Sequence, residues 1–395
     1  MKKIYLKKGK DESLRRFHPW VFSGAIHHAD TDLAEGDTVL VLTAEGLPIA
    51  VGHYQKGSIA VRVLAFCDDS ADEPFVGDAI GDMFWRQRLG SALRVRQAVG
   101  IADRPQNNTY RLVHGEGDML PGLIIDIYGR TAVMQAHSVG MHLNRHVIAA
   151  QLMAVMDGRI EHVYYKSEGT LSFIDPENGF LIGGSDDNVA VENGLKFHVD
   201  WLRGQKTGFF VDQRENRALL ERYAKGRRVL NMFCYTGGFS VYAMRGGAEL
   251  VHSVDSSGKA IELTNRNVEL NFPGDSRHTA FCDDAFKFMD HSEANAPCPA
   301  VKYDLVVLDP PAFAKHRGAL HNALKGYTRL NQKAFEMIQP GGILFTFSCS
   351  QVVTKDHFRN AVFTAAALAK RKVRILHQLH QPADHPINIY HPEGE

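Results

Sequence analysis

The chain has 395 residues with 45 lysines and arginines and 45 aspartates and glutamates, so its formal net charge is zero. That length favours more than one domain, and 44% hydrophobic with 23% charged residues is typical of a soluble globular protein. The five cysteines form no CxxC pair, which argues against a disulfide framework and against a zinc site. The scattered cysteines fit a reducing cytoplasm, so we expect a cytoplasmic protein without a metal. No apolar run is long enough to cross a bilayer.

The first 70 residues are rich in short β-type segments. Apolar and β-branched runs at Thr38–Leu42, Ile49–Tyr54 and Ile59–Phe66 are separated by Glu-Gly and Lys-Gly turn signals. This spacing predicts a small β-barrel. Seven lysines and arginines lie within the first 16 residues against two acidic residues, which indicates either a surface that contacts phosphates or a solvated basic terminus.

Residues 71–185 combine helical and β-type patterns and predict an α+β domain. An acidic stretch of small residues at 68–82 has the composition of a linker. The expected elements are helices over Met83–Val99 and His142–Met156 and strands over Leu123–Tyr128, Ala132–Ala136 and His162–Lys166. The first helix carries four arginines that could contact phosphates or simply be solvated: Arg86, Arg88, Arg94 and Arg96.

Strand and helix patterns alternate from residue 186 to 395. A hairpin (Val189–Glu192 and Leu195–Val199) precedes a helix that begins near Asp212. The expected strands are Arg228–Met232, Leu250–Val254, His278–Cys282, Tyr303–Leu308, Ile343–Phe347 and Val373–His380, and the expected helices are Phe239–Met244, Lys259–Leu270, Ala285–Met289, Leu324–Ile338 and His357–Ala369. Strands joined by such helices predict a doubly wound parallel sheet, in which ligands bind beyond the carboxyl ends of the strands.

The segment after the first of these strands, NMFCYTGG, suits a nucleotide ligand. Gly237 and Gly238 come before a helix, where the backbone can approach a ligand closely. Phe233 and Tyr235, however, stand where the dinucleotide fingerprint GxGxxG has glycines. This departure disfavours an NAD-dependent oxidoreductase, and a plain tight turn between strand and helix remains the alternative.

Acidic residues follow the second and third strands. Asp255 ends the second strand and could accept hydrogen bonds from two ribose hydroxyls. Asp283 and Asp284 end the third strand and could accept one from an adenine amino group. Each carboxylate could instead cap the helix that follows it.

The fourth and fifth strands end in unusual residues. Asp309, Pro310 and Pro311 follow four apolar residues, and because two prolines cannot extend a central strand, a rigid turn is expected there. The fifth strand is followed by Ser348, Cys349 and Ser350. The cysteine either fills a gap in the core or is a nucleophile at the mouth of a site.

These segments, taken in order, resemble class I S-adenosylmethionine-dependent methyltransferases. LDPPAF is similar to the fourth motif of nucleobase methyltransferases, and FSCSQ to the sixth motif of RNA cytosine-5 methyltransferases. RFHPWVFSGAI (16–26), RLVHGEGDMLPGLIIDIYG (111–129) and KTGFFVDQRENR (206–217) resemble the PUA domain, the middle domain and the segment before the first motif of bacterial large-subunit rRNA methyltransferases. The resemblance spans essentially the whole chain and points to bacterial PUA-domain-containing 23S rRNA (cytosine-C5) methyltransferases.

The resemblance implies three domains: a PUA-like RNA-binding barrel (1–70), a central α+β domain (71–185) and a Rossmann-like methyltransferase domain (186–395). It implies S-adenosylmethionine as cofactor, and 23S rRNA, naked or partly assembled, as partner in the cytoplasm. A homodimer is compatible with it. Relatives continue past HPEGE with another short strand, so we expect the last strand of the sheet to be missing from this chain.

The resemblance also implies roles for individual residues. Cys349 would add to C6 of cytosine without a second cysteine, because Pro311 occupies the position of the cysteine in the fourth motif. Asp309 would hold the cytosine amino group or act on N3, and the base that removes the C5 proton is not identified. Cys234 and Cys282 are expected to be packing residues. The implied cofactor contacts are Phe210, Asp212, Gln213, Asn231, Phe233, Tyr235, Gly237, Asp255, Asp283, Asp284 and Asp309, and the implied substrate contacts are Pro310, Pro311, Phe313 and Lys315.

Two other functions compete with this interpretation. An Asp-Pro-Pro turn followed by an aromatic residue also occurs in enzymes that methylate exocyclic amines, where no thiol is needed and Cys349 would be structural. The second alternative is a non-catalytic RNA-binding assembly factor with a degenerate Rossmann domain, which the acidic residues at 255 and 284 disfavour.

Overall fold

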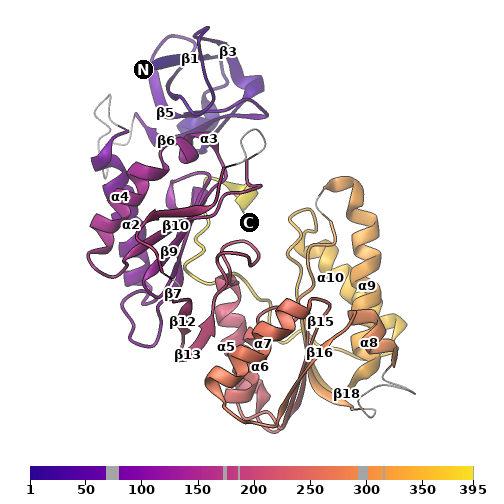
Figure 1. The fold of residues 1–395 in the computed structure, drawn as a ribbon. Helices are drawn as coiled ribbons and strands as arrows, with labels where there is room; N and C mark the ends of the chain where they lie inside the picture. The colour runs from indigo at the N-terminus through magenta and orange to yellow at the C-terminus, as the bar shows by residue number, and fades with distance from the viewer. Residues whose placement is uncertain (68–79, 172–175, 186, 292–300, 315, 395) are drawn as a thin grey trace. The chain divides into compact units, whose positions relative to one another are not determined.

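The computed structural model describes residues 1–67, 80–171, 176–185, 187–291, 301–314 and 316–394 (Figure 1). The predicted linker 68–82 therefore lies mostly outside the described residues. The chain divides into two compact units: the first comprises Met1–Gly194, Val199–Asp212 and Gln381–Glu395, and the second Leu195–His198 and Gln213–His380. Within the described part, no helix is both apolar enough and long enough to cross a membrane.

The first unit begins with a six-stranded sheet in the order β2-β6-β5-β4-β1-β3. Burial alternates along much of β1 and β4, whereas β5 and β6 are buried over most of their length. Ile4, Val39, Val41 and Val61 belong to the core and have no exposed surface. The predicted N-terminal β domain is thereby confirmed. Its elements are β1 (Lys2–Leu6), α1 (Glu12–Arg15), β2 (Trp20–Phe22), η1 (Ser23–Ala25), β3 (Ile26–Ala29), β4 (Thr38–Leu42), β5 (Pro48–Tyr54) and β6 (Ile59–Phe66).

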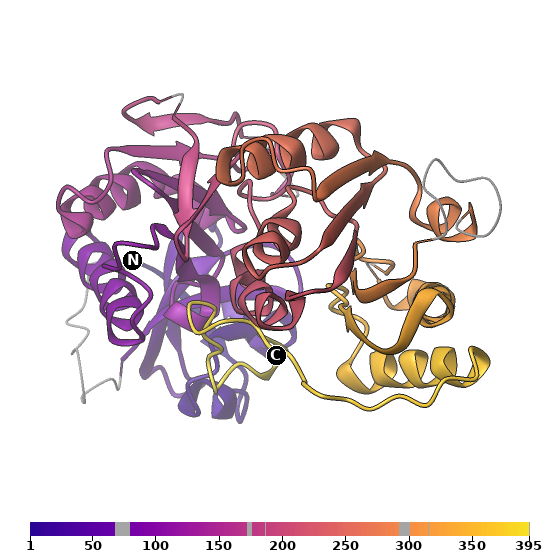
Figure 2. The same cartoon turned by 90° about the horizontal axis from the view of Figure 1, so that it is seen from below.

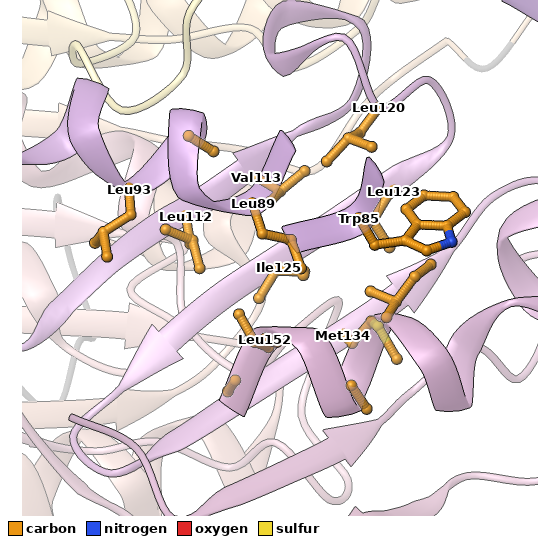
Figure 3. Close-up of a cluster of buried hydrophobic side chains, with 14 of the residues drawn as sticks. Trp85, Leu89, Leu93, Leu112, Val113, Leu120, Leu123, Ile125, Met134 and Leu152 are labelled. Carbon is orange, nitrogen blue, oxygen red and sulfur yellow. The ribbon is translucent and has the colours of Figure 1, made fainter. Parts of the chain in front are cut away.

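The first unit continues with a five-stranded sheet in the order β11-β10-β9-β8-β7. Helices α2 and α4 cover it: Figure 3 shows Trp85 and Leu89 of α2 and Leu152 of α4 meeting sheet residues such as Leu112 and Ile125. The elements are α2 (Asp82–Ala98), β7 (Thr109–His114), η2 (Gly115–Asp118), β8 (Leu123–Tyr128), β9 (Thr131–Ala136), α3 (Val139–Leu143), α4 (Arg145–Met156), β10 (His162–Tyr165) and β11 (Gly179–Ile182). The predicted α+β arrangement is confirmed.

Arg96 of α2 is not a phosphate ligand, so that part of the arginine prediction is wrong. Its side chain has no exposed surface and forms a two-pronged ion pair with Asp118, in which Nη2 lies 2.8 Å from Oδ2. The guanidinium also donates to the carbonyl oxygens of Arg111 (2.8 Å) and Asp384 (2.7 Å). Arg96 lies on the face of α2 that packs against the sheet. A charge buried there needs a counter-ion and hydrogen-bond acceptors, because no water is available to solvate it.

The C-terminal residues 381–394 pack on the first unit. Asp384 is fully buried and accepts a hydrogen bond from the backbone N–H of Arg111 at 3.0 Å. The His391 ring lies 4.3 Å from that of Trp20, in the RFHPWVF segment. A Cβ on Gly117 would stand 1.9 Å from the Pro386 carbonyl oxygen, so only glycine permits this close approach. The tail thus joins two segments that are far apart in sequence, 16–26 and 111–129.

The second unit contains a five-stranded parallel sheet in the order β16-β15-β14-β17-β18, and the predicted doubly wound fold is confirmed. Helices α6 and α7 pack on one face of this sheet, and α8 and α9 pack on the other face (Figure 1). Right-handed crossovers on either side of the central strand β14 produce this arrangement. The elements of the second unit are β13 (Leu195–His198), α5 (Arg214–Ala224), β14 (Arg228–Met232), α6 (Gly238–Arg245), β15 (Leu250–Asp255), α7 (Gly258–Asn271), β16 (His278–Cys282), α8 (Ala285–His291), β17 (Tyr303–Leu308), η4 (Arg317–Ala319), α9 (Leu320–Met337), β18 (Ile338–Thr346) and α10 (Lys355–Leu368). The first unit also contains β12 (Val189–Glu192), η5 (Pro392–Gly394) and most of η3 (Val211–Gln213).

The predicted strand Val373–His380 is wrong, because this segment forms no ladder with the sheet and runs as coil past α10 (Figure 2). Arg371 donates to the carbonyls of Phe335 and Ile338, at the start of β18. Further along, His377 shares a hydrogen bond with the Tyr223 hydroxyl of α5 at 2.8 Å. The chain therefore crosses from the α9–β18 junction to α5 instead of running along β18.

Candidate active site

The carboxyl ends of the five parallel strands meet at one edge of the sheet. Met232 pairs in register with Val254 and Leu308, and Leu308 pairs with Thr346. The residues that follow these strands therefore lie along the same edge, which is where ligands bind in doubly wound sheets.

The loop after β14 has a left-handed backbone at three alternate residues. The φ angles are 58° at Phe233, 46° at Tyr235 and 74° at Gly237, although non-glycine residues rarely adopt such values. The loop follows the path that glycines would allow, at a cost of order 1–3 kcal/mol for each non-glycine residue. A Cβ at Gly237 would meet Thr264 Cγ2 at 2.7 Å, so this position requires glycine on contact as well as on φ.

Hydrogen bonds from neighbouring elements hold this strained loop. Thr264 Oγ1 of α7 donates to the Tyr235 carbonyl at 2.9 Å, and Asn267 Nδ2 donates to the Thr236 carbonyl at 2.8 Å. The carboxylate of Asp255 accepts from the backbone N–H of Tyr235 (3.1 Å) and of Ser257 (2.9 Å). Asp255 is half-buried, and each of its oxygens retains a further lone pair for a diol.

Asn231 points beneath the loop rather than along it. Its Nδ2 donates to Ser240 Oγ at 2.9 Å, and that hydroxyl shares a 2.7 Å hydrogen bond with Ser253, which in turn contacts His278 Nε2 at 2.8 Å. Burial lowers the pKa of His278 to about 4, so the chain of polar groups is neutral at physiological pH. Within the described residues, Asn231 Oδ1 has no hydrogen-bond partner.

Asp284 caps α8, which was the structural alternative in the sequence. Its Oδ1 accepts from the backbone N–H groups of Phe286 (3.0 Å) and Lys287 (3.1 Å). Asp283 binds the backbone N–H of Asp284 at 2.8 Å through Oδ1. Both lie beside the end of β15, since the Asp283 N–H donates to the Asp255 carbonyl at 3.0 Å. Their contact with an adenine stays a prediction.

The structure brings together the DQREN and DPP segments. Gln213 Nε2 donates to Asp309 Oδ2 at 3.1 Å, and Asn216 Nδ2 donates to Gln213 Oε1 at 2.7 Å. Asp309 is half-buried, Pro310 is buried and Pro311 is exposed. The start of α5 therefore orients the carboxylate that follows β17.

Phe210 and Asp212 belong to the first unit, where the KTGFF segment is anchored to the central sheet. Thr207 Oγ1 donates to Asp126 Oδ2 at 2.6 Å, and the Tyr128 hydroxyl donates to the Phe209 carbonyl at 3.1 Å. Lys206 Nζ lies 5.2 Å from the centre of the Phe210 ring. Asp212 lies in η3, at the junction with the second unit. Their role toward a cofactor stays a prediction.

Cys349 is exposed and lies at the same strand edge as Asp309. Its Sγ lies 3.7 Å from the carbonyl oxygen of Pro310 in the Asp-Pro-Pro turn. The flanking serines are both bound to one buried hydroxyl: Ser348 Oγ donates to the Tyr327 hydroxyl at 3.0 Å, and that hydroxyl shares a 3.3 Å hydrogen bond with Ser350 Oγ. The thiol therefore sits on a turn that is fixed on both sides.

Tyr327 of α9 is a residue that the sequence interpretation missed. Its ring lies 4.6 Å from that of Phe313, in the DPPAF segment, and 5.2 Å from Phe358 of α10. Ser350 Oγ also accepts from the backbone N–H of Ala314 at 3.3 Å, so the loops after β17 and β18 are joined directly. The sequence feature that could have identified Tyr327 is its hydroxyl on the apolar face of α9. It stands there in helical register with Ala323, Leu330 and Ala334, which are also buried. Lys315 lies outside the described residues.

The other described cysteines differ from each other. Cys234 is buried as predicted, and burial raises the pKa of its thiol to about 12. The packing prediction is wrong for Cys282, which is exposed because β16 is an edge strand of the sheet. No cluster of three or more potential metal ligands occurs among residues that the structure describes.

Comparisons with known proteins agree with this geometry. The model of the S-adenosylmethionine-dependent methyltransferase family matches residues 174–388, and that of the PUA-like domain matches residues 4–66. The chain is 38% identical over 400 residues to Ribosomal RNA large subunit methyltransferase I of Tolumonas auensis and 36% identical over 403 residues to that of Escherichia coli strain SMS-3-5. Each alignment covers 99% of this chain and 96% of the relative.

Solved structures share the fold over the whole chain. A protein described as a candidate SAM-dependent methyltransferase, from Streptococcus mutans, superposes with a TM-score of 0.80 at 22% identity and covers 100% of this chain and 97% of that one. A methyltransferase candidate complexed with SAH gives a TM-score of 0.82 at the same identity and coverage. The strained loop after β14, the carboxylate after β15 and the helix that follows each strand fit a nucleoside-containing cofactor.

Proposed function

Because the chain belongs to the S-adenosylmethionine-dependent methyltransferase family, we propose that it methylates C5 of a cytosine in large-subunit ribosomal RNA through a covalent adduct on Cys349. The names of the relatives support the substrate class, and the PUA-like domain supports RNA binding. One observation carries the chemical proposal: an exposed thiol stands at the carboxyl edge of the sheet, 3.7 Å from the carbonyl of the Asp-Pro-Pro turn.

Cytosine C5 is a poor nucleophile until a nucleophile adds to C6. The Cys349 thiolate forms a bond to C6, and the electrons of the C5–C6 double bond then make C5 nucleophilic. When bound, S-adenosylmethionine would supply an electrophilic methyl group, whose bond to the sulfonium sulfur breaks on transfer and leaves a neutral thioether. After C5 has bonded to the methyl carbon, a base takes the C5 proton, the C5–C6 double bond re-forms and the sulfur leaves as thiolate. We assign no residue to that base.

The chain's own residues orient the groups that react. Asp309, whose carboxylate accepts a hydrogen bond from Gln213, would accept another from the exocyclic amino group of the target cytosine. Pro310 presents the carbonyl that contacts the thiol, and Pro311 and Phe313 border the base. A base reaches Cys349 only when it leaves its stack, so a flexible loop of naked or partly assembled 23S rRNA is the proposed substrate.

The cofactor contacts are proposed from the same edge. Asp255 would bind the ribose hydroxyls, and Asp283 and Asp284 the adenine. Asn231, Phe233, Tyr235 and Gly237 would border the methionine part, with Phe210 and Asp212 completing the contacts. A cytoplasmic location and a homodimer are expectations that accompany this proposal.

The test uses RNA that contains 5-fluorocytosine. Fluorine replaces the C5 hydrogen that the base must remove as a proton, so the adduct stays trapped. With cofactor present, the unmodified chain should form a covalent complex that survives denaturing electrophoresis, and ordinary RNA should gain 5-methylcytidine. Cys349→Ala should lose both. Cys282→Ala is the matched control, since its thiol is also exposed at this edge of the sheet, and it should retain both.

Two outcomes would overturn the proposal. Methylation of an exocyclic nitrogen by Cys349→Ala, identified by nucleoside mass spectrometry, would show that the thiol is structural. An absence of S-adenosylmethionine binding in calorimetry would favour a non-catalytic RNA-binding protein.

A further inference from the structure

Positive charge is concentrated in one part of a chain whose formal net charge is zero. Residues 310–380 contain 11 lysines and arginines against two acidic residues, whereas the other 324 residues contain 34 against 43. Such local asymmetry is a characteristic of surfaces that bind nucleic acid. It lies in the methyltransferase unit, far in sequence from the PUA-like domain.

Three of these lysines and arginines form a row on α9 together with a histidine. His321, Lys325, Arg329 and Lys333 are spaced four residues apart, which places them on one face of the helix about 6 Å from one another along its axis. The first three are exposed, and Lys333 is half-buried and bound to Asp290 at 2.7 Å. We call His321, Lys325 and Arg329 the α9 stripe.

Two cations of the α9 stripe, Lys325 and Arg329, form no ion pair among the residues that the structure describes, since neither has an acidic side chain within 4.0 Å there. Several other arginines of the same unit are paired with acids, among them Arg228 with Asp304 and Arg245 with Glu221. A stripe without counter-charges is therefore available to an anionic partner.

The surroundings of the stripe suit a phosphate backbone. It borders a groove between α9 and α10 that is also lined by Thr328, Gln332 and Thr364. The Gln332 amide donates one hydrogen to Glu336 at 2.9 Å and has a second one for a phosphate or sugar oxygen. The Arg329 guanidinium lies over the Phe286 ring, 4.6 Å from its centre, which limits its freedom before any ligand binds.

The helix that carries the stripe also positions the proposed nucleophile. Helix α9 follows the DPPAF loop and η4, and Tyr327, on the buried face of α9 opposite Lys325 and Arg329, binds the serines beside Cys349. A strand of RNA whose base occupies the Cys349 site can thus extend its backbone along the same helix. We propose that the α9 stripe binds phosphates of the RNA strand that flanks the target base, an inference that rests on the proposed function.

The test compares two double variants of the second unit. Lys325→Gln with Arg329→Gln removes the stripe, and Lys259→Gln with Arg266→Gln removes two exposed charges from α7 as the matched control. Affinity for a labelled single-stranded rRNA fragment is measured by fluorescence anisotropy over a range of salt concentrations. Two lost phosphate contacts should weaken binding about tenfold at 0.15 M salt and reduce the slope of log K against log salt by about 1.4.

Kinetics give a second readout. The stripe variant should show a raised KM for RNA and an unchanged kcat at saturating RNA, and Lys325→Arg with Arg329→Lys should restore the affinity. Equal RNA affinities and salt slopes for the stripe and control variants would overturn the inference. It would also be overturned if the stripe variant lost affinity for an acidic protein and kept its full affinity for RNA. The binding assay is repeated in the Cys349→Ala chain. It measures RNA binding without methyl transfer, so it tests the stripe even if the proposed chemistry of Cys349 is wrong.

Discussion

Removing the Tyr327 hydroxyl tests whether the two loops of the candidate site act as one. Tyr327 has no exposed surface, and its hydroxyl contacts Ser348 at 3.0 Å and Ser350 at 3.3 Å, on either side of Cys349. Tyr327→Phe keeps the ring and its contacts with Phe313 and Phe358. The substitution therefore releases the Ser-Cys-Ser turn while it leaves the apolar packing of α9 in place.

The expected magnitudes follow from these contacts. Ser350 keeps the hydrogen bond from the Ala314 N–H, whereas Ser348 loses the acceptor for its hydroxyl. The free energy of unfolding should fall by about 1–2 kcal/mol. If the thiol is displaced by about 1 Å, the rate of methyl transfer should fall by roughly 10²-fold, with little change in the affinity for the cofactor.

Single-turnover methyl transfer and the rate of covalent trapping on 5-fluorocytosine RNA measure this loss. Tyr303→Phe is the matched control, because Tyr303 is 2% exposed and its hydroxyl shares a 2.8 Å hydrogen bond with His252 at the opposite end of β17. The control should lose similar stability and retain the full rate. Equal single-turnover rates for the two variants would refute a positioning role for Tyr327.

Two further predictions concern buried charge in the first unit. Asp118→Asn should lower the free energy of unfolding by about 3–5 kcal/mol in urea denaturation, because it leaves the guanidinium of Arg96 buried without a counter-ion. The control Glu161→Gln removes an exposed ion pair with Arg130 and should cause no measurable loss of stability. Equal effects of the two substitutions would contradict the reasoning. Burial lowers the pKa of His53 to about 4, below its unfolded value of 6.5, so its contribution is complete above pH 6.5 and is lost as the pH falls toward 4. The loss attributable to it is about 3 kcal/mol at most, and denaturation curves of His53→Gln should show a shallower dependence on pH than those of the unmodified chain; parallel curves would exclude this origin.

Most strands and helices of both units could be predicted because their signals are local. The parallel strands read as continuous apolar runs, and residues such as Leu230 and Val306 are indeed without exposed surface. Parallel strands must end at a common edge, so the order of segments alone placed Asp255, Asp309 and Cys349 along one line. The sequence by itself therefore determined the architecture and the position of the candidate site.

Only the tertiary structure decided features that depend on distant partners. The apolar pattern at 373–380 is that of a strand, yet contacts of Arg371 and His377 take the chain across the unit to α5. Arg96 is buried because Asp118 and the tail residue Asp384 surround it, and no local pattern records that. The hydroxyl of Tyr327 meets the Cys349 turn for the same reason: a period specifies which face of a helix is buried, and packing specifies what that face touches.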